Sequence, residues 1–455
     1  MKTIHSINPA TEEKIDSYDR ISEEIAKEKI EVAQKAYLKW KSTSFEVRSK
    51  LMRNLADIFD DKKEEYAQLA TKEMGKIIKQ SRGEIEKCAK ICRYYADNIQ
   101  DLLADETIQT EAKKSYVTFQ PLGVTLAVMP WNFPFYQVIR FAIPAIMTGN
   151  TVVLKHASSV QGCAFALENA FEKAGCPKGV FSNLNLESKD IKNVIENKNI
   201  IAVSLTGSES AGRSIAKIAG ENLKKTVLEL GGSDAYLFLE DIDIENATDI
   251  ATFGRLQNNG QTCIAAKRFI VLAEIYDDFL TLFTKKMGEK KMGDPTNEDV
   301  FYGPMARLDL RDEIHQQVKK TIEQGAKLVL GGKIPERKGA YYPATILTNV
   351  KPGMTAFDEE LFGPVAAVIK AKDEKHAIEL ANNSNFGLGA GVFTKDLKKG
   401  EKIALQLEAG NSFVNKLVVS DPRLPFGGIK NSGYGRELSY YGIREFVNTK
   451  TIWIE

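Results

Sequence analysis

Leu228-Glu229-Leu230-Gly231-Gly232 opens, and Asn259-Gly260-Gln261-Thr262-Cys263 closes, the stretch from which the rest of this sequence can be interpreted. The first segment places a carboxylate before two glycines, and the second ends on a thiol. Glu229 and Cys263 are 34 positions apart, so only the fold can bring their side chains together. Because a thiolate is strongly nucleophilic even when little of the thiol is ionised, the pair is a candidate nucleophile and general base.

A plainer interpretation of these two residues is a buried structural cysteine and a surface glutamate, because free cysteine is among the most buried residue types. The surrounding sequence decides against it. Further blocks follow in order along the chain: Pro130-Trp131-Asn132-Phe133-Pro134, Thr206-Gly207-Ser208, Glu359-Glu360-Leu361-Phe362-Gly363-Pro364, Asn385-Phe386-Gly387-Leu388, Pro425-Phe426-Gly427-Gly428 and Ser432-Gly433-Tyr434-Gly435-Arg436-Glu437.

Together these blocks resemble the active site and cofactor site of the NAD(P)-dependent aldehyde dehydrogenase superfamily. The resemblance runs from about Ile7 to the C-terminus, and six blocks in order are far more specific than one. Within the superfamily the chain is most similar to succinate semialdehyde dehydrogenases, particularly a short bacterial form.

Composition limits the class of protein. A chain of 455 residues exceeds one ordinary core and predicts two or more domains. Lys+Arg 62 against Asp+Glu 61 leaves a net charge of +1, so no overall basic field favours nucleic acid or a membrane surface. Five cysteines without Cys-x-x-Cys spacing indicate a reducing compartment, and the absence of an apolar signal or membrane segment predicts a cytoplasmic protein. The four scattered histidines predict no metal site.

Hydrophobic spacing predicts an α/β protein. From Ser22 to about Asp105, apolar residues recur every three or four positions, which is typical of three or four amphipathic helices. Beyond residue 116 short strands alternate with helices, which predicts βαβ units and a parallel sheet.

The resemblance implies how this α/β chain divides into domains. A Rossmann-type nucleotide-binding domain would comprise 1–111 and 122–230, and an α/β catalytic domain 231–435. A small β oligomerisation element would comprise 112–121 and 436–455, and would join copies into a homodimer or homotetramer.

The same resemblance assigns the catalytic roles. Cys263 attacks the aldehyde, and Glu229 activates the water that hydrolyses the resulting thioester. The Asn132 side-chain amide and the backbone N–H of Cys263 stabilise the oxyanion, where each donor contributes about 3–4 kcal/mol. An alternative role for Asn132 is a helix N-cap before Phe133 and Pro134.

No Gly-x-Gly-x-x-Gly motif marks a cofactor site, but Thr206, Gly207 and Ser208 stand between a strand and a helix, where backbone N–H groups can hold phosphate. The resemblance adds Pro130 and Trp131 to this site, and places Glu360 and Phe362 against the nicotinamide ribose and ring.

Ser158 departs from the family pattern, because members that prefer NAD usually carry glutamate there. Serine can donate to a 2′-phosphate and Lys155 supplies positive charge, so we predict NADP as the preferred cofactor and NAD as a second one. In the alternative interpretation, Ser158 only caps the helix that follows.

The predicted substrate is a short aldehyde with a distal carboxylate, most plausibly succinate semialdehyde. Arg140 follows Asn132 by about two helical turns and is able to clamp a carboxylate bidentately, with Gln137 on the same face. Arg255 is a weaker second clamp, and Ser420 and Phe426 lie in the segment that shapes the family's tunnel mouth. Two alternatives stay open: a general dehydrogenase for neutral aldehydes, and a catalytically silent nucleotide-binding or structural protein.

Overall fold

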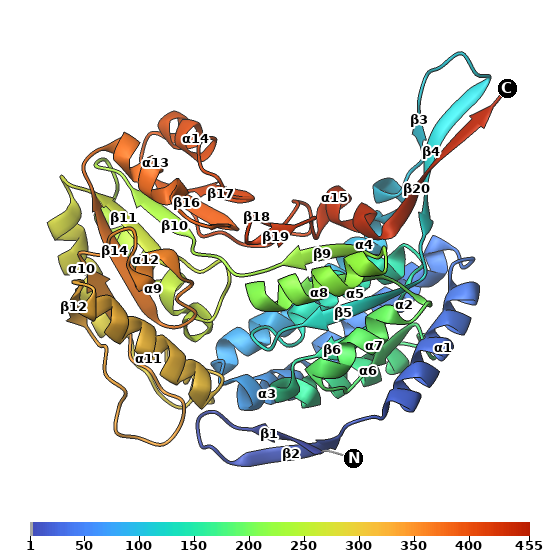
Figure 1. Ribbon diagram of the computed structural model, residues 1–455, viewed down its shortest axis with the longest axis horizontal. Coiled ribbons are helices and arrows are strands. Elements are labelled where there is room, and N and C mark those ends of the chain that lie inside the picture. Colours follow the sequence, from blue (N-terminus) through green and yellow to red (C-terminus); the bar gives the residue numbers. More distant parts are fainter. Residues whose placement is uncertain (1–2) are drawn as a thin grey trace.

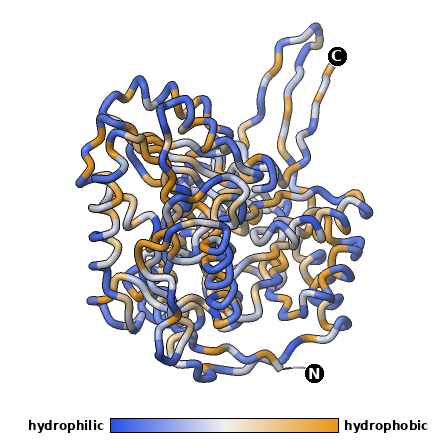
Figure 2. The backbone as a smooth tube through the Cα atoms, turned by 60° about the vertical axis from the view of Figure 1, so that its left-hand side comes forward, coloured by the Kyte–Doolittle hydropathy of each residue, from blue (hydrophilic) through white to orange (hydrophobic). Residues whose placement is uncertain are grey.

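The structure, a computed structural model, describes residues 3–455 and places a large sheet in each of two α/β bodies (Figure 1). One sheet has six strands and the other seven, and a three-stranded arm projects away from both bodies. Hydrophobic segments gather inside the two bodies, whereas the arm stands clear of them (Figure 2). The predicted α/β class is confirmed. No helix among residues 3–455 combines the length and apolar character that crossing a bilayer requires.

The chain begins with a hairpin and then forms a layer of helices. Strands β1 (Thr3–Ile7) and β2 (Lys14–Asp19) pair antiparallel. The predicted helical region contains α1 (Glu23–Trp40), α2 (Phe45–Asp61), α3 (Lys63–Met74) and α4 (Ile78–Leu102). Ser22 and Ser44 cap the first two helices through their hydroxyls, and left-handed Gly75 ends the third. The spacing of apolar residues therefore predicted this layer correctly.

The six-stranded sheet forms the core of the first body, with strand order β19-β9-β8-β5-β6-β7, and is parallel except for β19. Its strands are β5 (Val124–Met129), β6 (Thr151–His156), β7 (Phe181–Asn183), β8 (Ile200–Thr206), β9 (Lys225–Glu229) and β19 (Gly433–Tyr434). Helices α5 (Tyr136–Met147), α6 (Gln161–Lys173), α7 (Ile191–Glu196) and α8 (Glu209–Glu221) connect them, with 3₁₀ turns at Ser158–Val160 and Ser188–Asp190.

The strand order of this sheet reverses between β5 and β8. The chain runs from β5 outward to β6 and β7, and then returns to place β8 on the other side of β5. In doubly wound sheets, ligands bind outside the carboxyl ends of the strands at such a reversal. Met129 and Thr206 are those ends here, so the predicted cofactor residues that follow them lie at the position where the topology favours a ligand.

The seven-stranded sheet forms the core of the second body, in the order β12-β13-β14-β11-β10-β16-β17, with only β12 antiparallel. Its strands are β10 (Ala235–Phe238), β11 (Arg268–Leu272), β12 (Lys327–Leu330), β13 (Thr345–Thr348), β14 (Val365–Ala371), β16 (Gly389–Phe393) and β17 (Asn411–Val414). Helices α9 (Ile244–Leu256), α10 (Tyr276–Gly288), α11 (Leu308–Glu323), α12 (Thr355–Asp358), α13 (Glu374–Asn382) and α14 (Leu397–Ala404) cover it.

The C-terminal segment returns from the second body to the first and then enters the arm (Figure 1). β18 (Ile429–Lys430) pairs with β15 (Phe386–Gly387), and β19 then joins the six-stranded sheet beside β9. After α15 (Ser439–Ile443) and a 3₁₀ turn at Arg444–Phe446, β20 (Val447–Ile454) pairs with β4 (Lys114–Pro121), which also pairs with β3 (Glu106–Thr107). One strand segment thus ties the two bodies and the arm together.

A buried carboxylate holds the start of α5. Glu84 of α4 accepts the backbone N–H groups of Phe135 and Tyr136, each at 2.9 Å, in place of the missing helical partners. Its other oxygen forms an ion pair with Lys76, and neither side chain is more than 1% exposed. The Lys76 ammonium also lies 3.8 Å from the centre of the Phe133 ring. This pair therefore fixes the segment that carries Asn132.

We expect Glu84→Gln to destabilise the protein by about 3–5 kcal/mol, because Lys76 would become a buried charge without its partner. Urea titrations of the variant and the parent chain measure the change. Glu86→Gln is the matched control on the same helix: Glu86 pairs with Lys63 at the exposed surface, so its loss costs at most about 1 kcal/mol. Equal unfolding midpoints for Glu84→Gln and Glu86→Gln would contradict the role given to the buried pair.

Candidate active site

A cavity of about 380 Å³ brings together residues of both bodies. Its walls contain nine residues that the sequence predicted for the site: Pro130, Trp131, Asn132, Gln137, Thr206, Gly207, Ser208, Glu360 and Phe362, together with Cys263. The remaining lining residues are Leu230, Gly231, Leu310, Glu313, Ile314 and Gln317. The two turns that open and close the segment from residue 228 to 263 therefore meet at one cavity.

The loop before Cys263 has an unusual backbone. Asn258, Asn259 and Gly260 are three consecutive residues with positive φ, at 51°, 58° and 77°. The Asn258 amide donates to the carbonyls of Asn132 and Gln261, both at 2.9 Å. The Asn259 side chain bonds across three segments: its amide nitrogen donates to the carbonyls of Gly75 and Pro304, and its oxygen accepts from the backbone N–H of Gly303. Asparagine tolerates this conformation better than most residues, which explains its occurrence here.

Gly260 is required at its position for two reasons. Its φ of 77° favours glycine, and an added Cβ would lie 2.3 Å from the carbonyl carbon of Gly363. Its carbonyl accepts a hydrogen bond from Arg255 Nη2 at 2.5 Å. Arg255 is fully buried and is not part of the cavity wall. The structure therefore does not bring Arg255 to the place where a second carboxylate clamp was expected, and its guanidinium supports the loop instead.

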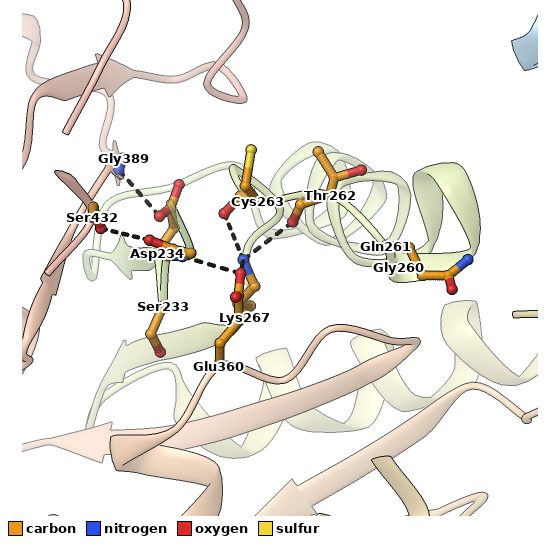
Figure 3. Close-up of polar contacts among 12 residues, drawn as sticks. Ser233, Asp234, Gly260, Gln261, Thr262, Cys263, Lys267, Glu360, Gly389 and Ser432 are labelled. Atoms are coloured by element: carbon orange, nitrogen blue, oxygen red, sulfur yellow. Dashed lines mark hydrogen bonds and ion pairs between the residues drawn. The ribbon is translucent and has the colours of Figure 1, made fainter. Parts of the chain in front are cut away.

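Lys267 binds the carbonyl side of the cysteine loop. Its ammonium donates to the carbonyl oxygens of Thr262 at 3.1 Å and Cys263 at 2.6 Å, and pairs with Glu360 Oε1 at 3.1 Å. Glu360 in turn accepts the backbone N–H of Gly232 at 3.0 Å. Figure 3 shows the Cys263 sulfur pointing away from this cluster. The sequence did not single out Lys267, although a lysine four residues after a candidate nucleophile was a visible signal.

The Cys263 thiol is partly exposed and lines the cavity, so the interpretation as an inert core cysteine is wrong. The surrounding protein raises the pKa of this thiol to about 12, while the positive charges of Arg140 and Lys267 act in the opposite direction. The other four cysteines are buried and lie away from the cavity.

Asn132 is buried beside the thiol-bearing loop, and its amide donates to the carbonyl of Gln261 at 3.1 Å. An amide nitrogen carries two N–H donors, so this bond uses only one of them. Helix α5 begins at Tyr136 and no side chain caps it. The alternative in which Asn132 is the N-cap is therefore wrong.

Glu229 ends strand β9 directly before Leu230 and Gly231, which line the cavity. The side chain is 2% exposed, and neither carboxylate oxygen has a hydrogen-bond partner among the described residues. Burial raises the pKa of Glu229 well above its usual range, and Glu437 raises it further, while Arg140 and Arg436 oppose the shift. A carboxyl group in this environment holds a proton that it can release when its surroundings change.

The phosphate-type turn has the predicted geometry. Gly207 and Ser208 follow strand β8, and Ser208 caps α8 by accepting the N–H of Ala211 at 3.3 Å. The dipole and free N–H groups at the start of a helix of this length favour an anion there.

Lys155 and Ser158 follow the carboxyl end of the neighbouring strand, β6. The Lys155 ammonium is buried, and donates to the Ser188 hydroxyl at 3.1 Å. Within the described residues no carboxylate lies within 4 Å of it. Ser158 begins a 3₁₀ turn and makes no capping bond to the helix after it, so the alternative role as a helix cap is wrong.

The predicted substrate residues divide into two groups. Gln137 lines the cavity, whereas Arg140, Ser420 and Phe426 lie beyond its wall. Arg140 is 2% exposed, forms an ion pair with Glu437, donates to Thr206 Oγ1 at 3.4 Å, and lies 4.7 Å from the Phe426 ring centre. Its charge is therefore already compensated by an acid within the protein.

Lys87 is a residue of this region that the sequence reasoning missed. Its ammonium donates to the Ser420 hydroxyl at 2.7 Å, and that hydroxyl also bonds the Tyr136 hydroxyl at 2.8 Å. The signal was present in helix α4, because Lys87 shares the face of the buried residues Glu84, Cys88 and Ile91. No group of three or more His, Cys, Asp or Glu side chains within residues 3–455 is arranged to hold a metal ion.

Gly260→Ala is expected to lower kcat/KM about a hundredfold, since the Cβ clash forces the loop to shift and a misplacement of about 1 Å can cost that much. Steady-state oxidation of an aldehyde measures the loss. Gly83→Ala provides the control: an added Cβ there meets nothing within 4 Å, so this exposed α4 position should keep full activity. Equal activity of the two variants would show that the loop tolerates the shift.

Alkylation of Cys263 by iodoacetamide is expected to accelerate about tenfold per pH unit from pH 7 to 10, without a plateau. The reason is that the pKa of about 12 keeps the thiolate fraction rising throughout this range. An ordinary thiol, with a pKa of about 8.5, would level off near pH 9. Subtracting the label taken up by Cys263→Ala isolates the signal of this residue, and a plateau below pH 9 would contradict the raised pKa.

Comparison with known proteins agrees with this geometry. The aldehyde dehydrogenase family model matches residues 1–452. A succinate semialdehyde dehydrogenase of Escherichia coli K12, with NAD(P)+ in its name, is 46% identical over 448 residues, which cover 98% of this chain and 97% of that protein. A probable NADP+-dependent succinate-semialdehyde dehydrogenase of Synechocystis is 46% identical, over 99% of both chains. The crystal structure of the Streptococcus pyogenes succinic semialdehyde dehydrogenase with NADP+ is 39% identical over 99% of both chains, with a TM-score of 0.97. The chain belongs to the aldehyde dehydrogenase family.

Proposed function

We propose that this chain oxidises succinate semialdehyde, or a similar short aldehyde with a distal carboxylate, to the acid and passes the hydride to NADP. The observation that carries the proposal is that Cys263 lines the same cavity as Gly207 and Ser208, which follow the sheet's point of reversal. The substrate class is supported by nearly full-length relatives that bear this name.

In the first half-reaction, the Cys263 sulfur adds to the aldehyde carbonyl carbon and forms a thiohemiacetal. The negative charge that develops on the carbonyl oxygen is stabilised by the second N–H of the Asn132 amide and by the backbone N–H of Cys263. Arg140 and Lys267 favour the thiolate, because both lower the pKa of the thiol. When bound, the nicotinamide supplies the hydride acceptor, so that a thioester remains on Cys263.

In the second half-reaction, Glu229 removes a proton from the water that attacks this thioester. The raised pKa suits a base that must hold a proton and later release it. An added Cβ at Gly427 would lie 2.6 Å from Glu229 Oε1, so this glycine leaves the room that the carboxylate occupies. Hydrolysis frees the acid and returns Cys263 to the thiol.

The residues of the cofactor region fit NADP. The buried Lys155 ammonium has a hydroxyl partner and no carboxylate within 4 Å among the described residues, which leaves its charge for a phosphate. Ser158 stands beside it where NAD-preferring relatives usually have an acid, and a serine hydroxyl can donate to the 2′-phosphate. Pro130, Trp131, Glu360 and Phe362 would hold the nicotinamide end, and NAD would bind more weakly.

The distal carboxylate of the substrate would point beyond Gln137 toward the group formed by Arg140, Ser420 and Phe426. Arg140 contributes positive charge there even while it pairs with Glu437. The neutral-aldehyde alternative is the reading that this group argues against. A silent, purely structural protein is disfavoured because Cys263, Asn132 and Glu229 are all retained.

The predicted domain division into 1–111 with 122–230, 231–435, and 112–121 with 436–455 belongs to the same proposal. The arm would join two or four copies, because β20 ends in the exposed apolar residues Trp453 and Ile454. A near-neutral charge and unpaired cysteines favour a protein of the cytoplasm.

Steady-state assays with succinate semialdehyde and butyraldehyde, each with NADP and NAD, test the proposed function. We expect kcat/KM to be about tenfold or more higher for the carboxylated substrate and about tenfold higher with NADP, since each factor of ten needs only one good charge-assisted contact. Cys263→Ala should abolish turnover of both aldehydes. Equal turnover of the two aldehydes would instead identify a general aldehyde dehydrogenase.

A further inference from the structure

Lys87 is a partly buried cation without an acidic partner. It lies on α4, its ammonium is 2.7 Å from Ser420 Oγ and 4.1 Å from the centre of the Tyr136 ring, and it forms no ion pair within 4 Å among the described residues. A cation placed on an aromatic face and one hydroxyl is only partly compensated for the water it has lost. Such a site is suited to receive an anion.

The acids nearest to Lys87 are already bound elsewhere. Glu84, one turn earlier on α4, pairs with Lys76 and caps α5. Asp421, next to Ser420, accepts two bonds from the Arg423 guanidinium, at 2.8 and 2.7 Å. Neither carboxylate is therefore available to neutralise the Lys87 ammonium.

Arg140 differs from Lys87 in this respect. The Arg140 guanidinium pairs with buried Glu437, so this arginine and its partner add no net charge to the region. The uncompensated positive charge of the group is that of Lys87. Tyr136 connects the two cations, because its ring lies under the Lys87 ammonium and 5.9 Å from the Arg140 guanidinium carbon.

The Lys87 site also adjoins the catalytic cavity. Tyr136 directly precedes Gln137, which lines the cavity, and Phe426 packs on Arg140 from the other side. Electrostatic coupling of Arg140 to both Cys263 and Glu229 places the arginine between Lys87 and the reacting groups. A short substrate whose aldehyde reaches Cys263 would therefore extend its far end toward Lys87.

We propose that Lys87 is a specificity-determining residue that binds the distal carboxylate of the substrate, with the Ser420 hydroxyl as a second donor. The inference rests on the proposed function and adds the group that selects the substrate. In binding, one carboxylate oxygen accepts from the ammonium, and Ser420 turns its hydroxyl from Lys87 or Tyr136 toward the ligand. No covalent step is involved.

Lys87→Met tests this assignment, because methionine keeps most of the length and removes the charge. We expect kcat/KM for succinate semialdehyde to fall about 10- to 100-fold, mainly through KM, as one charge-assisted bond is lost. Turnover of butyraldehyde should change less than about threefold, which also shows that the variant is folded. Lys87→Arg should restore most of the preference, and Lys79→Met, an exposed lysine of α4, should leave it unchanged.

A second measurement follows from ionisation. Burial lowers the pKa of Lys87 to about 8, with a further lowering by Arg140 on α5, whereas Cys88 and Glu84 on α4 and Asp421 in the adjacent segment raise it. Tyr136 also faces the ammonium. Because the ammonium loses its charge above that pH, the ratio of kcat/KM for succinate semialdehyde to that for butyraldehyde should fall as pH rises through about 8. The ratio cancels the ionisation of Cys263, and in Lys87→Arg it should stay constant.

The possible outcomes separate the two proposals. If the parent chain shows no preference for succinate semialdehyde, the proposed function fails. If the parent prefers it and Lys87→Met retains that preference within about twofold, the function stands and the role of Lys87 is refuted. If Lys87→Met loses butyraldehyde turnover as well, Lys87→Gln and Ser420→Ala replace it, and an unchanged preference in both would refute the assignment.

Discussion

The active site depends on three consecutive left-handed residues, Asn258, Asn259 and Gly260, because they direct the chain into the cavity just before Cys263. This conformation is unfavourable for residues with a Cβ, and it persists because the asparagine side chains are fully engaged. Asn259 bonds Gly75 in the helical layer and Pro304 in the second body, while Asn258 bonds Asn132 in the first. The position of the thiol is therefore set by both bodies at once.

Compensation of buried charge follows a consistent pattern. Lys76 pairs with Glu84, Lys267 with Glu360, and Arg140 with Glu437, so these cations stabilise loops and helix ends without leaving charge to spare. Lys155 and Lys87 differ, because each binds a serine hydroxyl and has no carboxylate within 4 Å among residues 3–455. One follows a strand end of the sheet that would hold the dinucleotide, and the other adjoins the substrate end of the cavity. The two uncompensated lysines lie where the proposed reaction brings a phosphate and a carboxylate.

The sequence predicted the elements better than the contacts between them. Buried apolar runs gave β11, β12 and β16 their observed bounds, because four or five residues suffice to display the pattern. Two-residue strands such as β18 and β19 have no period to detect, although β19 joins the C-terminal segment to the first body. The contacts that correct the site join distant positions: Arg140 to Glu437, and Lys87 to Ser420 across 333 residues. No local pattern encodes such pairs, so Arg140 looked free and Lys87 looked ordinary.

The same burial that creates the cavity also keeps its reactive groups neutral. It raises the pKa of both Cys263 and Glu229, so neither carries much charge at neutral pH. Arg140 lowers both pKa values and thus favours each group in the form that reacts, first the thiolate and later the carboxylate. Glu437 holds that arginine in place and also opposes ionisation of Glu229. A single buried ion pair therefore couples the nucleophile, the base and the substrate end of the cavity, and a change at any of the three alters the proton affinity of the others.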